Sequence, residues 1–379
     1  MKIAVIRQKY VNYGGAESFV AQYTTELANA GHEVHIFASQ WKTGKHPNLH
    51  VHTVRAVKSN SLLRTLSFAW YAAREVQKQK FDIIQSHERT FYQDVYRAGD
   101  GCHREWLEQR KKFLSPVKRF FLTLNPFHNL ILALEKRLFE KNGCRKIIAI
   151  SQMVKQDIQK HYKVAEDKIA VVYNGVELQR FHPNNKTLFR KAVRENLCIP
   201  DDVALILFVG SGFERKGLKF LLQSLQFLRS DNWRLLLMGK GNWERYLSFA
   251  PDGGRKKIYT LEPRDDIEKY YAAADIFVLP SIYEPFGNAC LEALATGLPI
   301  VVSAHSGAAE ILRPGENGMV VRNSADPKEI ADRINTLFDP DVRETVGRNG
   351  RLLAEQFTQE KNLAGMMKIY EEIIKTSEY

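Results

Sequence analysis

Short apolar runs alternate along the chain with longer segments whose apolar residues recur at helical spacing. Residues 2–7 form the first apolar run, typical of a buried strand. Residues 16–30 then place four side chains on one helical face: Phe19, Val20, Tyr23 and Leu27. Ser151 is expected to cap a helix that extends to about residue 162. Further strands are expected at 34–38, 51–54, 83–86, 94–97 and 147–150.

The same pattern restarts in the second half with a continuous apolar run at 205–209. A glycine-rich loop at 210–217 precedes a helix that is expected to end near residue 228. Later strands are expected at 234–238, 257–260, 276–280 and 300–303. Because short strands alternate with helices, the predicted fold is α/β, with two Rossmann-like doubly wound domains facing a cleft. Ligands are expected at the carboxyl ends of the strands.

The length of 379 residues also favours two domains, because a single core usually stops growing at about 250–300 residues. We expect one domain over 1–173 and another over 174–359. The last helix, from about residue 360, has an apolar face that must pack on another element. Its members are Leu363, Met366, Met367, Ile369, Tyr370, Ile373 and Ile374.

Composition excludes several classes of protein. Apolar residues make up 44% and charged residues 26%, as in ordinary globular domains. The four cysteines form no CxxC pair, which favours reduced thiols in a cytosolic protein. No run reaches 18 apolar residues, and the six-residue apolar start is too short for a secretory signal, so neither a membrane span nor export is expected.

The net charge of +12 is unevenly distributed. Residues 1–175 hold 28 Lys or Arg against 15 Asp or Glu, whereas residues 176–379 hold 27 against 28. The excess is greatest over 101–150, with 11 basic and 4 acidic residues. This asymmetry favours an anionic acceptor, an anionic membrane surface or nucleic acid as a partner of the first half, although a lysine-rich solvated surface would produce it too.

The segment 281–293 carries two carboxylates eight residues apart, at a strand–turn–glycine–helix junction. Glu284 is expected in the turn, and Glu292 about two turns into a helix that begins near Phe286. Gly287 would let a ligand approach the backbone, and the amides at the helix start suit hydroxyls or anions. A helical carboxylate can accept two hydrogen bonds from vicinal hydroxyls such as those of ribose.

Two glycine-containing loops complete the candidate binding groups. Arg215 and Lys216 lie in the loop that follows the strand at 205–209, where a basic pair beside backbone amides suits a diphosphate. Gly14 and Gly15 follow the first strand and could bring backbone close to a phosphate. The sequence has no GxxxxGK[ST] loop, and the GxGxxG fingerprint expected for a nicotinamide cofactor is missing.

Together these motifs resemble the family 4 glycosyltransferases of the GT-B fold, over most of the chain. The matching segments are 14–15, 150–158, 172–177, 210–217 and 284–292. The resemblance implies that Arg215 and Lys216 neutralise the donor diphosphate, that Glu292 holds the ribose, and that the sugar is held by Glu284 with backbone amides. It implies retention of anomeric configuration and no metal or other cofactor. It also implies that the helix at about 360–379 returns to the first domain. The implied donor-binding residues are Gly14, Gly15, Arg215, Lys216, Glu284, Phe286, Gly287, Asn288 and Glu292.

The stretch 94–107 is similar to glucosyltransferases of the lipopolysaccharide core that act on inner-core heptose. Many relatives have a histidine at the position of Asp100, which we therefore expect, with Glu284, to be catalytic and to face the transferred sugar. An Asp-Gly turn is the alternative for Asp100. His87 and His103 are weaker candidates, since an isolated histidine is more often packed or at the surface.

Residues 104–124 mix basic and aromatic side chains at helical spacing, with a break expected before Pro116. Such a segment suits an anionic membrane interface, although an amphipathic helix packed on its own domain would show the same spacing. The candidate interface residues are Trp106, Arg110, Lys111, Lys112, Phe113, Lys118, Arg119, Phe120 and Phe121.

The sequence thus favours a retaining hexosyltransferase that uses a nucleotide sugar, UDP-glucose by resemblance, and a lipopolysaccharide-core glycolipid. It would act in the cytoplasm, peripherally on the inner face of the membrane, without nucleic acid. The alternatives are a nucleotide-sugar epimerase of the same fold and a family 4 transferase with another glycan acceptor. A lectin-like adaptor with a decayed site and a nicotinamide-linked reductase are less consistent with the motifs.

Overall fold

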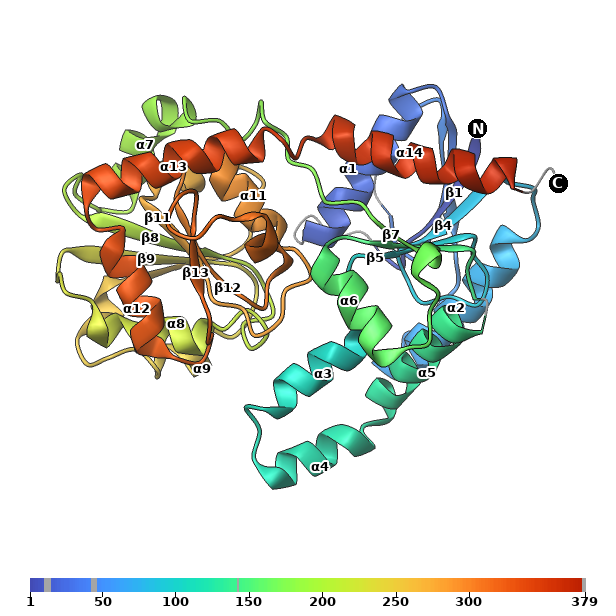
Figure 1. Ribbon diagram of the computed structural model, residues 1–379, viewed down its shortest axis with the longest axis horizontal. Helices are drawn as coiled ribbons and strands as arrows, with labels where there is room; N and C mark the ends of the chain where they lie inside the picture. Colours follow the sequence, from blue (N-terminus) through green and yellow to red (C-terminus); the bar gives the residue numbers. More distant parts are fainter. Residues whose placement is uncertain (10–14, 42–45, 142, 377–379) are drawn as a thin grey trace. The chain divides into compact units, whose positions relative to one another are not determined.

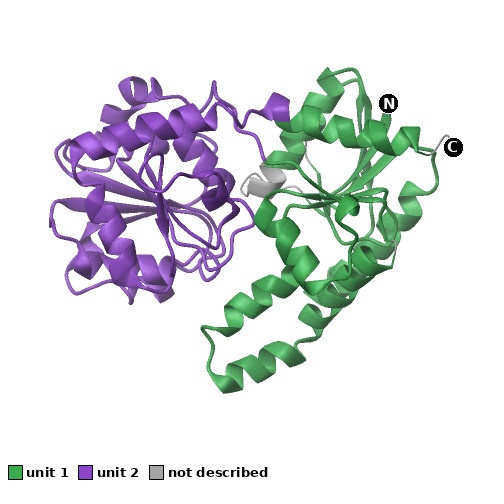
Figure 2. Cartoon of the chain, in the orientation of Figure 1, with its two compact units in different colours: residues 1–173, 362–379 green, residues 174–361 purple. Residues whose placement is uncertain are grey.

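The computed structural model describes residues 1–9, 15–41, 46–141 and 143–376, and backbone alone for 15–18. The chain divides into two compact units, one of residues 1–173 and 362–379 and the other of residues 174–361 (Figure 2). Each unit is a parallel sheet covered by helices (Figure 1), which confirms the α/β class with two Rossmann-like domains. The units are described separately below.

The first unit has a seven-stranded sheet in the order β3-β2-β1-β4-β5-β6-β7. Strand order reverses between β1 and β4, so the ends of these two strands flank the position where doubly wound sheets bind ligands. Its elements are β1 (Lys2–Ile6), α1 (Gly15–Asn29), β2 (Glu33–Ala38), β3 (Leu49–Thr53), α2 (Ser61–Val76), β4 (Ile83–Ser86), β5 (Val95–Ala98), α3 (His103–Lys111), α4 (Pro116–Leu124), α5 (Pro126–Glu140), β6 (Lys146–Ala149), α6 (Gln152–His161), η1 (Glu166–Lys168), β7 (Ile169–Val171) and α14 (Gln359–Lys375).

Helices α1 and α14 lie on one face of this sheet. Buried residues of both helices, including Leu27, Met366 and Tyr370, pack with Ile3 and Val5 of β1. Helix α2 packs on the opposite face, where Phe68 and Ala72 contact a cluster formed by alternate residues of β1, β2 and β4. The last helix of the chain therefore completes the core of the first unit (Figure 1).

The second unit has a six-stranded sheet in the order β10-β9-β8-β11-β12-β13, which reverses between β8 and β11. Its elements are α7 (Asn185–Asn196), β8 (Ala204–Val209), α8 (Leu218–Ser224), η2 (Leu225–Phe227), β9 (Trp233–Met238), α9 (Glu244–Leu247), η3 (Gly254–Lys257), β10 (Ile258–Leu261), α10 (Glu268–Ala273), β11 (Ile276–Leu279), α11 (Asn288–Ala295), β12 (Ile300–Ser303), η4 (Gly307–Ile311), β13 (Met319–Val321), α12 (Pro327–Thr336) and α13 (Pro340–Ala354).

Several boundaries differ from those the sequence predicts. Strand β5 begins at Val95, one residue later than predicted, and the side chain of Asp94 accepts a hydrogen bond from the Ile84 amide at 2.9 Å. The sequence pattern predicts neither strand β7 nor strand β13. Each has three residues, too few for an apolar pattern to be recognised. Ser151 caps α6 as expected, accepting a hydrogen bond from the Val154 amide at 3.1 Å.

Candidate functional site

Two loops meet at the point of strand reversal in the second unit. Residues 210–217 follow β8, and residues 280–287 follow the adjacent strand β11. The Ile282 amide donates to the Arg215 carbonyl at 2.8 Å, which joins the two loops. The glycine-rich loop and the first of the two predicted carboxylates therefore lie together, at the edge where parallel sheets bind ligands.

Glu284 lies between the two basic residues of the glycine-rich loop. Its Oε1 is 3.2 Å from Arg215 Nη1, and its Oε2 is 2.8 Å from Lys216 Nζ. Burial by itself would raise the pKa of Glu284, but the two cations outweigh that effect and lower the pKa to about 2. The carboxylate is therefore ionised at neutral pH, and the group of three carries a net positive charge.

Gly210 allows Lys216 to take this position. A Cβ atom at Gly210 would lie 2.4 Å from Lys216 Cε, and the backbone there has φ of +142°. Gly217, at φ +71°, is equally constrained, because a Cβ atom would lie 1.9 Å from the Pro280 carbonyl oxygen. Gly217 is therefore needed for the close approach of the two loops, and Gly210 for the position of Lys216 within its own loop.

Gly287 precedes α11 with φ of +91°, a conformation that favours glycine. The backbone of Glu284 is held on the other side, donating to the His305 carbonyl at 2.9 Å and accepting from the Gly307 amide at 2.9 Å. Phe286 is fully buried, and its carbonyl accepts from the Ala308 amide at 3.0 Å, which holds the turn in place. The turn therefore directs the start of α11, with Asn288 as its first residue, toward the ends of β8 and β11.

Glu292 is the fifth residue of α11, because the helix begins at Asn288. The expectation that it lies about two turns into the helix is wrong, since the positive φ of Gly287 delays the helix start. Its Oε2 accepts a hydrogen bond from the Tyr271 hydroxyl at 2.7 Å, and burial raises the pKa of Glu292. Its side chain is partly accessible, so a diol could reach it.

The first unit gathers charged groups at its own point of strand reversal. Arg7 follows β1, and its Nη1 is 3.4 Å from Glu88 Oε1 and 3.8 Å from Asp100 Oδ2. His87 and Glu88 follow β4, and the His87 carbonyl accepts from Arg7 Nη1 at 3.5 Å. Burial raises the pKa of Glu88, with Asp100 adding to the rise and Arg7 opposing it. The structure thus brings the predicted Asp100 and His87 into one group with Arg7 and Glu88.

Asp100 and His87 differ in their surroundings. Asp100 lies in the turn after β5 with its side chain 48% exposed, so it is available to a ligand and is also a turn residue. His87 is buried, and desolvation, together with the charges of Arg97 and Arg7, holds its pKa well below the usual range. Its Nε2 is 2.9 Å from Gln85 Nε2, so it is a neutral, packed ring.

His103 belongs to a different group. Its Nε2 is 3.1 Å from His128 Nδ1, and burial is the first of the causes that lower its pKa to about 3. Its amide donates to the fully buried carboxylate of Glu135 at 2.7 Å. Gly14 lies outside the described residues, and Gly15 is the first residue of α1.

Several residues of these groups escape the sequence analysis. Arg7 stands directly after β1 and Glu88 two residues after β4, and this position at strand ends is the signal that would have found them. Tyr271 and Asn174 are brought from distant segments, and the Asn174 side-chain amide donates to Asn288. No local spacing links Tyr271 to Glu292, because that contact depends on the packing of α10 against α11.

The basic, aromatic segment forms the hairpin of α3 and α4, which extends from the sheet of the first unit (Figure 1). The break falls at Ser115, and Pro116 opens α4, as predicted. Leu107 of α3 is buried, but five apolar side chains between residues 113 and 124 are solvent-exposed. Leu122 is the buried residue of α4, so most of the apolar surface of α4 is not covered by its own domain. The exposed ones are Phe113, Val117, Phe120, Phe121 and Leu124.

Among the described residues, no helix is both long enough and apolar enough to cross a membrane.

Comparisons with known proteins agree with this architecture. Residues 13–180 match the family model described as Glycosyltransferase Family 4, and residues 204–340 match Glycosyl transferases group 1. The chain is 26% identical to the lipopolysaccharide glucosyltransferase WaaG of Escherichia coli over 326 residues, 85% of each protein. It is 25% identical to a D-inositol 3-phosphate glycosyltransferase of Paenarthrobacter aurescens, over 95% of this chain and 93% of that protein.

Solved structures show the same fold. The crystal structure of WaaG, described as a glycosyltransferase involved in lipopolysaccharide biosynthesis, matches with a TM-score of 0.85 and 22% identity, over 97% of this chain and 99% of that one. HepE of Anabaena, solved with UDP and glucose, matches with a TM-score of 0.74 and 18% identity, over 98% of this chain and all of that one. The two family models together match most of the chain, which therefore belongs to the family 4 glycosyltransferases of the GT-B fold.

Proposed function

We propose that this glycosyltransferase moves a hexose from a UDP-sugar, UDP-glucose in the first instance, to a lipopolysaccharide-core glycolipid with retention of anomeric configuration. The observation that carries the donor half of the proposal is the placement of Glu284 between Arg215 and Lys216 at the strand reversal of the second unit. This net positive group attracts a dianionic diphosphate. A neutral ligand would not need two cations at its binding site.

The chemistry follows from the charges. When the sugar leaves the nucleotide, negative charge develops on the diphosphate, and Arg215 and Lys216 stabilise it without a metal ion or other cofactor. Glu284 is ionised and can accept hydrogen bonds from sugar hydroxyls. Glu292, oriented by Tyr271, would accept from the ribose hydroxyls, and the turn from Phe286 to Asn288 would offer amides. The complexes of HepE with UDP and glucose support this choice of donor.

The acceptor would bind the first unit, where the excess of positive charge lies. Asp100 is the exposed carboxylate at the strand reversal, and we assign it to the transferred sugar, through a hydroxyl or the developing positive charge of the oxocarbenium ion. Arg7 Nη1, 3.8 Å from Asp100 Oδ2, places a positive charge beside this carboxylate. The similarity to WaaG, a lipopolysaccharide glucosyltransferase, favours a core glycolipid as acceptor.

The α3–α4 hairpin would hold the enzyme peripherally on the inner face of the cytoplasmic membrane. Phe120 and Phe121 are 60% and 66% exposed, and Lys118 and Arg119 precede them in the same helix. Aromatic side chains beside cations suit the boundary between acyl chains and anionic headgroups.

A donor and acceptor screen tests the proposal. Purified protein is incubated with each nucleotide sugar, with and without core glycolipid, and products are analysed by mass spectrometry and anomeric NMR. We expect glucose transfer from UDP-glucose with the anomeric configuration unchanged. Transfer only to another glycan would refute the core glycolipid as acceptor. Inversion of the anomeric configuration would refute the retaining mechanism. Epimerisation of the donor in the absence of acceptor would indicate an epimerase.

The role of Glu284 is tested separately. Glu284→Ala should reduce transfer at least a hundredfold, because sugar positioning is lost, while UDP binding measured by calorimetry largely persists. Glu316→Ala, which removes an exposed carboxylate of the same unit, is the control and should keep full activity. Full activity in Glu284→Ala would refute the assignment.

A further inference from the structure

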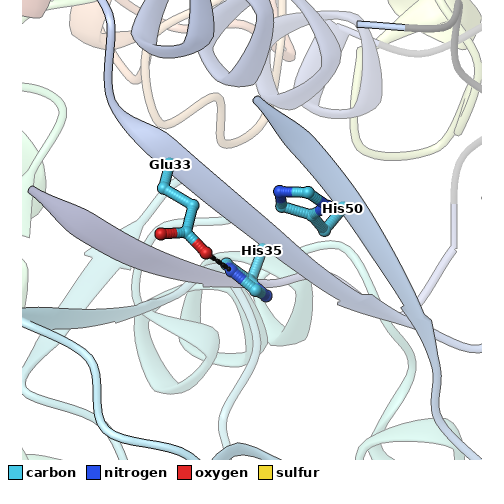
Figure 3. A group of neighbouring side chains, drawn as sticks. All are labelled: Glu33, His35 and His50. Atoms are coloured by element: carbon cyan, nitrogen blue, oxygen red, sulfur yellow. Dashed lines mark hydrogen bonds and ion pairs between the residues drawn. The ribbon is translucent and has the colours of Figure 1, made fainter. Parts of the chain in front are cut away.

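Three potential metal ligands meet on the edge of the sheet in the first unit. Strand β3 is the edge strand, and it pairs in parallel with β2 so that His35 is opposite His50. Glu33 and His35 are two residues apart on β2, so they point to the same face of the sheet. Figure 3 shows the Glu33 carboxylate against the His35 ring, with His50 on the neighbouring strand.

The ligand atoms are close enough to share one ion. Within the described part of the chain, Glu33, His35 and His50 are the group of this kind, with one ligand atom of each lying within 4.8 Å of the others. Glu33 Oε1 is 2.8 Å from His35 Nε2, and the rings of His35 and His50 have centroids 4.8 Å apart. Ligand atoms around a tetrahedral Zn²⁺ at bond lengths of about 2.0–2.1 Å are separated by roughly 3.3 Å, so small side-chain rotations would suffice.

His52 is the partner of the second ring nitrogen of His35. Its Nε2 is 2.7 Å from His35 Nδ1, and the two rings are stacked with centroids 5.0 Å apart. A metal-binding histidine usually engages its second ring nitrogen with such a partner, which fixes the ring and its tautomer. Because His35 Nδ1 is engaged by His52, His35 Nε2 is the ring nitrogen that faces Glu33 and is left to bind an ion.

The surroundings make the site partly preformed and accessible. His35 is buried, packed edge-on against Phe81 at 5.1 Å, so its ring is immobilised, whereas Glu33 and His50 are exposed. Lys2 Nζ is 3.3 Å from Glu33 Oε1 and competes with a cation for that carboxylate. The expected affinity is therefore moderate.

We propose that Glu33, His35 and His50 bind one Zn²⁺ ion, with His52 as the positioning residue behind His35. Two imidazoles and one carboxylate form a ligand set typical of zinc, with water completing four-coordination. The ion would link edge strand β3 to β2. This site is made by different residues from the donor-binding group, so the proposal is independent of whether glycosyl transfer needs a metal.

The test measures zinc binding on the full-length, tag-free protein after chelator treatment and dialysis. Calorimetric titration with ZnCl₂ at pH 7.5, repeated against a chromophoric chelator, should give one Zn²⁺ per chain with a Kd of about 1–10 μM. X-ray absorption at the zinc edge should report two imidazole nitrogens. A Kd for Zn²⁺ above about 100 μM in the wild type would overturn the proposal.

Variants locate the ion. Because His35 is buried, the exposed ligands are changed first: His50→Ala and Glu33→Gln should each weaken binding at least tenfold, with circular dichroism unchanged. His52→Ala should weaken binding by about 10-fold or more while keeping one ion per chain. His182→Ala, in the second unit, is the matched control and should bind like wild type. Unchanged affinity in His50→Ala, or loss of binding in His128→Ala instead, would place the ion elsewhere and refute the site.

Discussion

At the residue scale, the ion triplet of Glu284, Arg215 and Lys216 links stability to pH. The pKa of Glu284 is about 2 in the folded chain and near its ordinary value of about 4.5 when unfolded. A carboxylate whose pKa is lowered by folding stabilises the protein fully above the unfolded value, and that contribution is lost as the pH falls from about 4.5 toward 2.

Glu284→Gln should therefore reduce the free energy of unfolding at pH 7 by about 2–3 kcal/mol, since two partly buried cations lose their counter-charge. The difference from wild type should shrink as the pH falls from about 4.5 toward 2, because over this range the Glu284 carboxylate of the unfolded chain takes up a proton while that of the folded chain stays ionised. Urea unfolding of both proteins from pH 7 to pH 3 measures this. A difference that stayed constant over that range would contradict the link to ionisation.

A second residue-scale prediction concerns Gly210. Gly210→Ala should displace Lys216, because the new Cβ would overlap its Cε and Cδ atoms, and should weaken UDP binding about tenfold through loss of one charge-assisted hydrogen bond. Gly212→Ala is the matched control. Gly212 also has a positive φ, +76°, but a Cβ there meets nothing within 4 Å, so backbone strain is the shared effect. Equal loss of UDP affinity in both variants would show that strain, not Lys216, is responsible.

At the scale of elements, the buried carboxylate of Glu135 joins α5 to the start of α3, at the base of the α3–α4 hairpin. Glu135 of α5 accepts from Arg89 Nη2 at 2.7 Å, from the His103 amide at the start of α3 at 2.7 Å, and from the Tyr162 hydroxyl at 2.8 Å. Its position inside the unit makes each of these bonds costly to lose.

Glu135→Ala should lower the free energy of unfolding by about 3–5 kcal/mol, because the Arg89 guanidinium, itself largely buried, is left without its counter-ion. Glu75→Ala removes a half-buried carboxylate of α2 that pairs with the exposed Lys78, and should cost less than about 1 kcal/mol. Chemical denaturation of both variants tests the contrast, and a loss in Glu135→Ala no larger than in Glu75→Ala would contradict it.

The exposed face of α4 gives the second element-scale prediction. Replacing Phe120 and Phe121 by serine should reduce co-sedimentation with phosphatidylglycerol vesicles at least tenfold, because two aromatic side chains no longer insert. Wild-type binding should weaken with salt and be poor to phosphatidylcholine vesicles. Leu188→Ser removes an equally exposed apolar side chain, 67% accessible, from the second unit and should bind normally. Vesicle binding unaffected by the double substitution would remove the hairpin from the interface.

At the scale of the whole molecule, the last helix completes the core of the first unit. Tyr370 of α14 shares a hydrogen bond with the Tyr23 hydroxyl of α1 and donates to Gln85 Oε1 of β4 at 2.8 Å. Met366 is fully buried in the same cluster. The two compact units are thus stabilised by different parts of the chain end: α13 belongs to the second, and most of α14 to the first.

Met366→Ala should consequently destabilise the first unit by about 2–4 kcal/mol through lost burial and a residual cavity. Amide hydrogen exchange should quicken in β1 while staying unchanged in β8, and UDP affinity should persist. Leu352→Ala, an exposed position in α13, should alter neither. Faster exchange in both sheets of Met366→Ala would show that the units do not respond separately.

The sequence alone determined the architecture, because the alternation of buried strands and helices is a local property. The strands at 83–86 and 300–303 have the predicted bounds, Ser151 caps its helix, and Pro116 opens α4. The resemblance to the family could be seen in the same segments, because each motif combines a strand end, a glycine and a charged residue within a few positions of the sequence.

Which distant groups come together depends on the order of the strands and the packing of the helices. Glu284 approaches Arg215 and Lys216 because β8 and β11 are neighbours in the sheet although 68 or 69 residues separate the partners. Arg7 reaches Asp100, Tyr271 reaches Glu292, and the pairing of β2 with β3 places His35 opposite His50. Strand order and helix packing set these contacts, and both depend on the summed burial of the whole sheet, which no local spacing encodes.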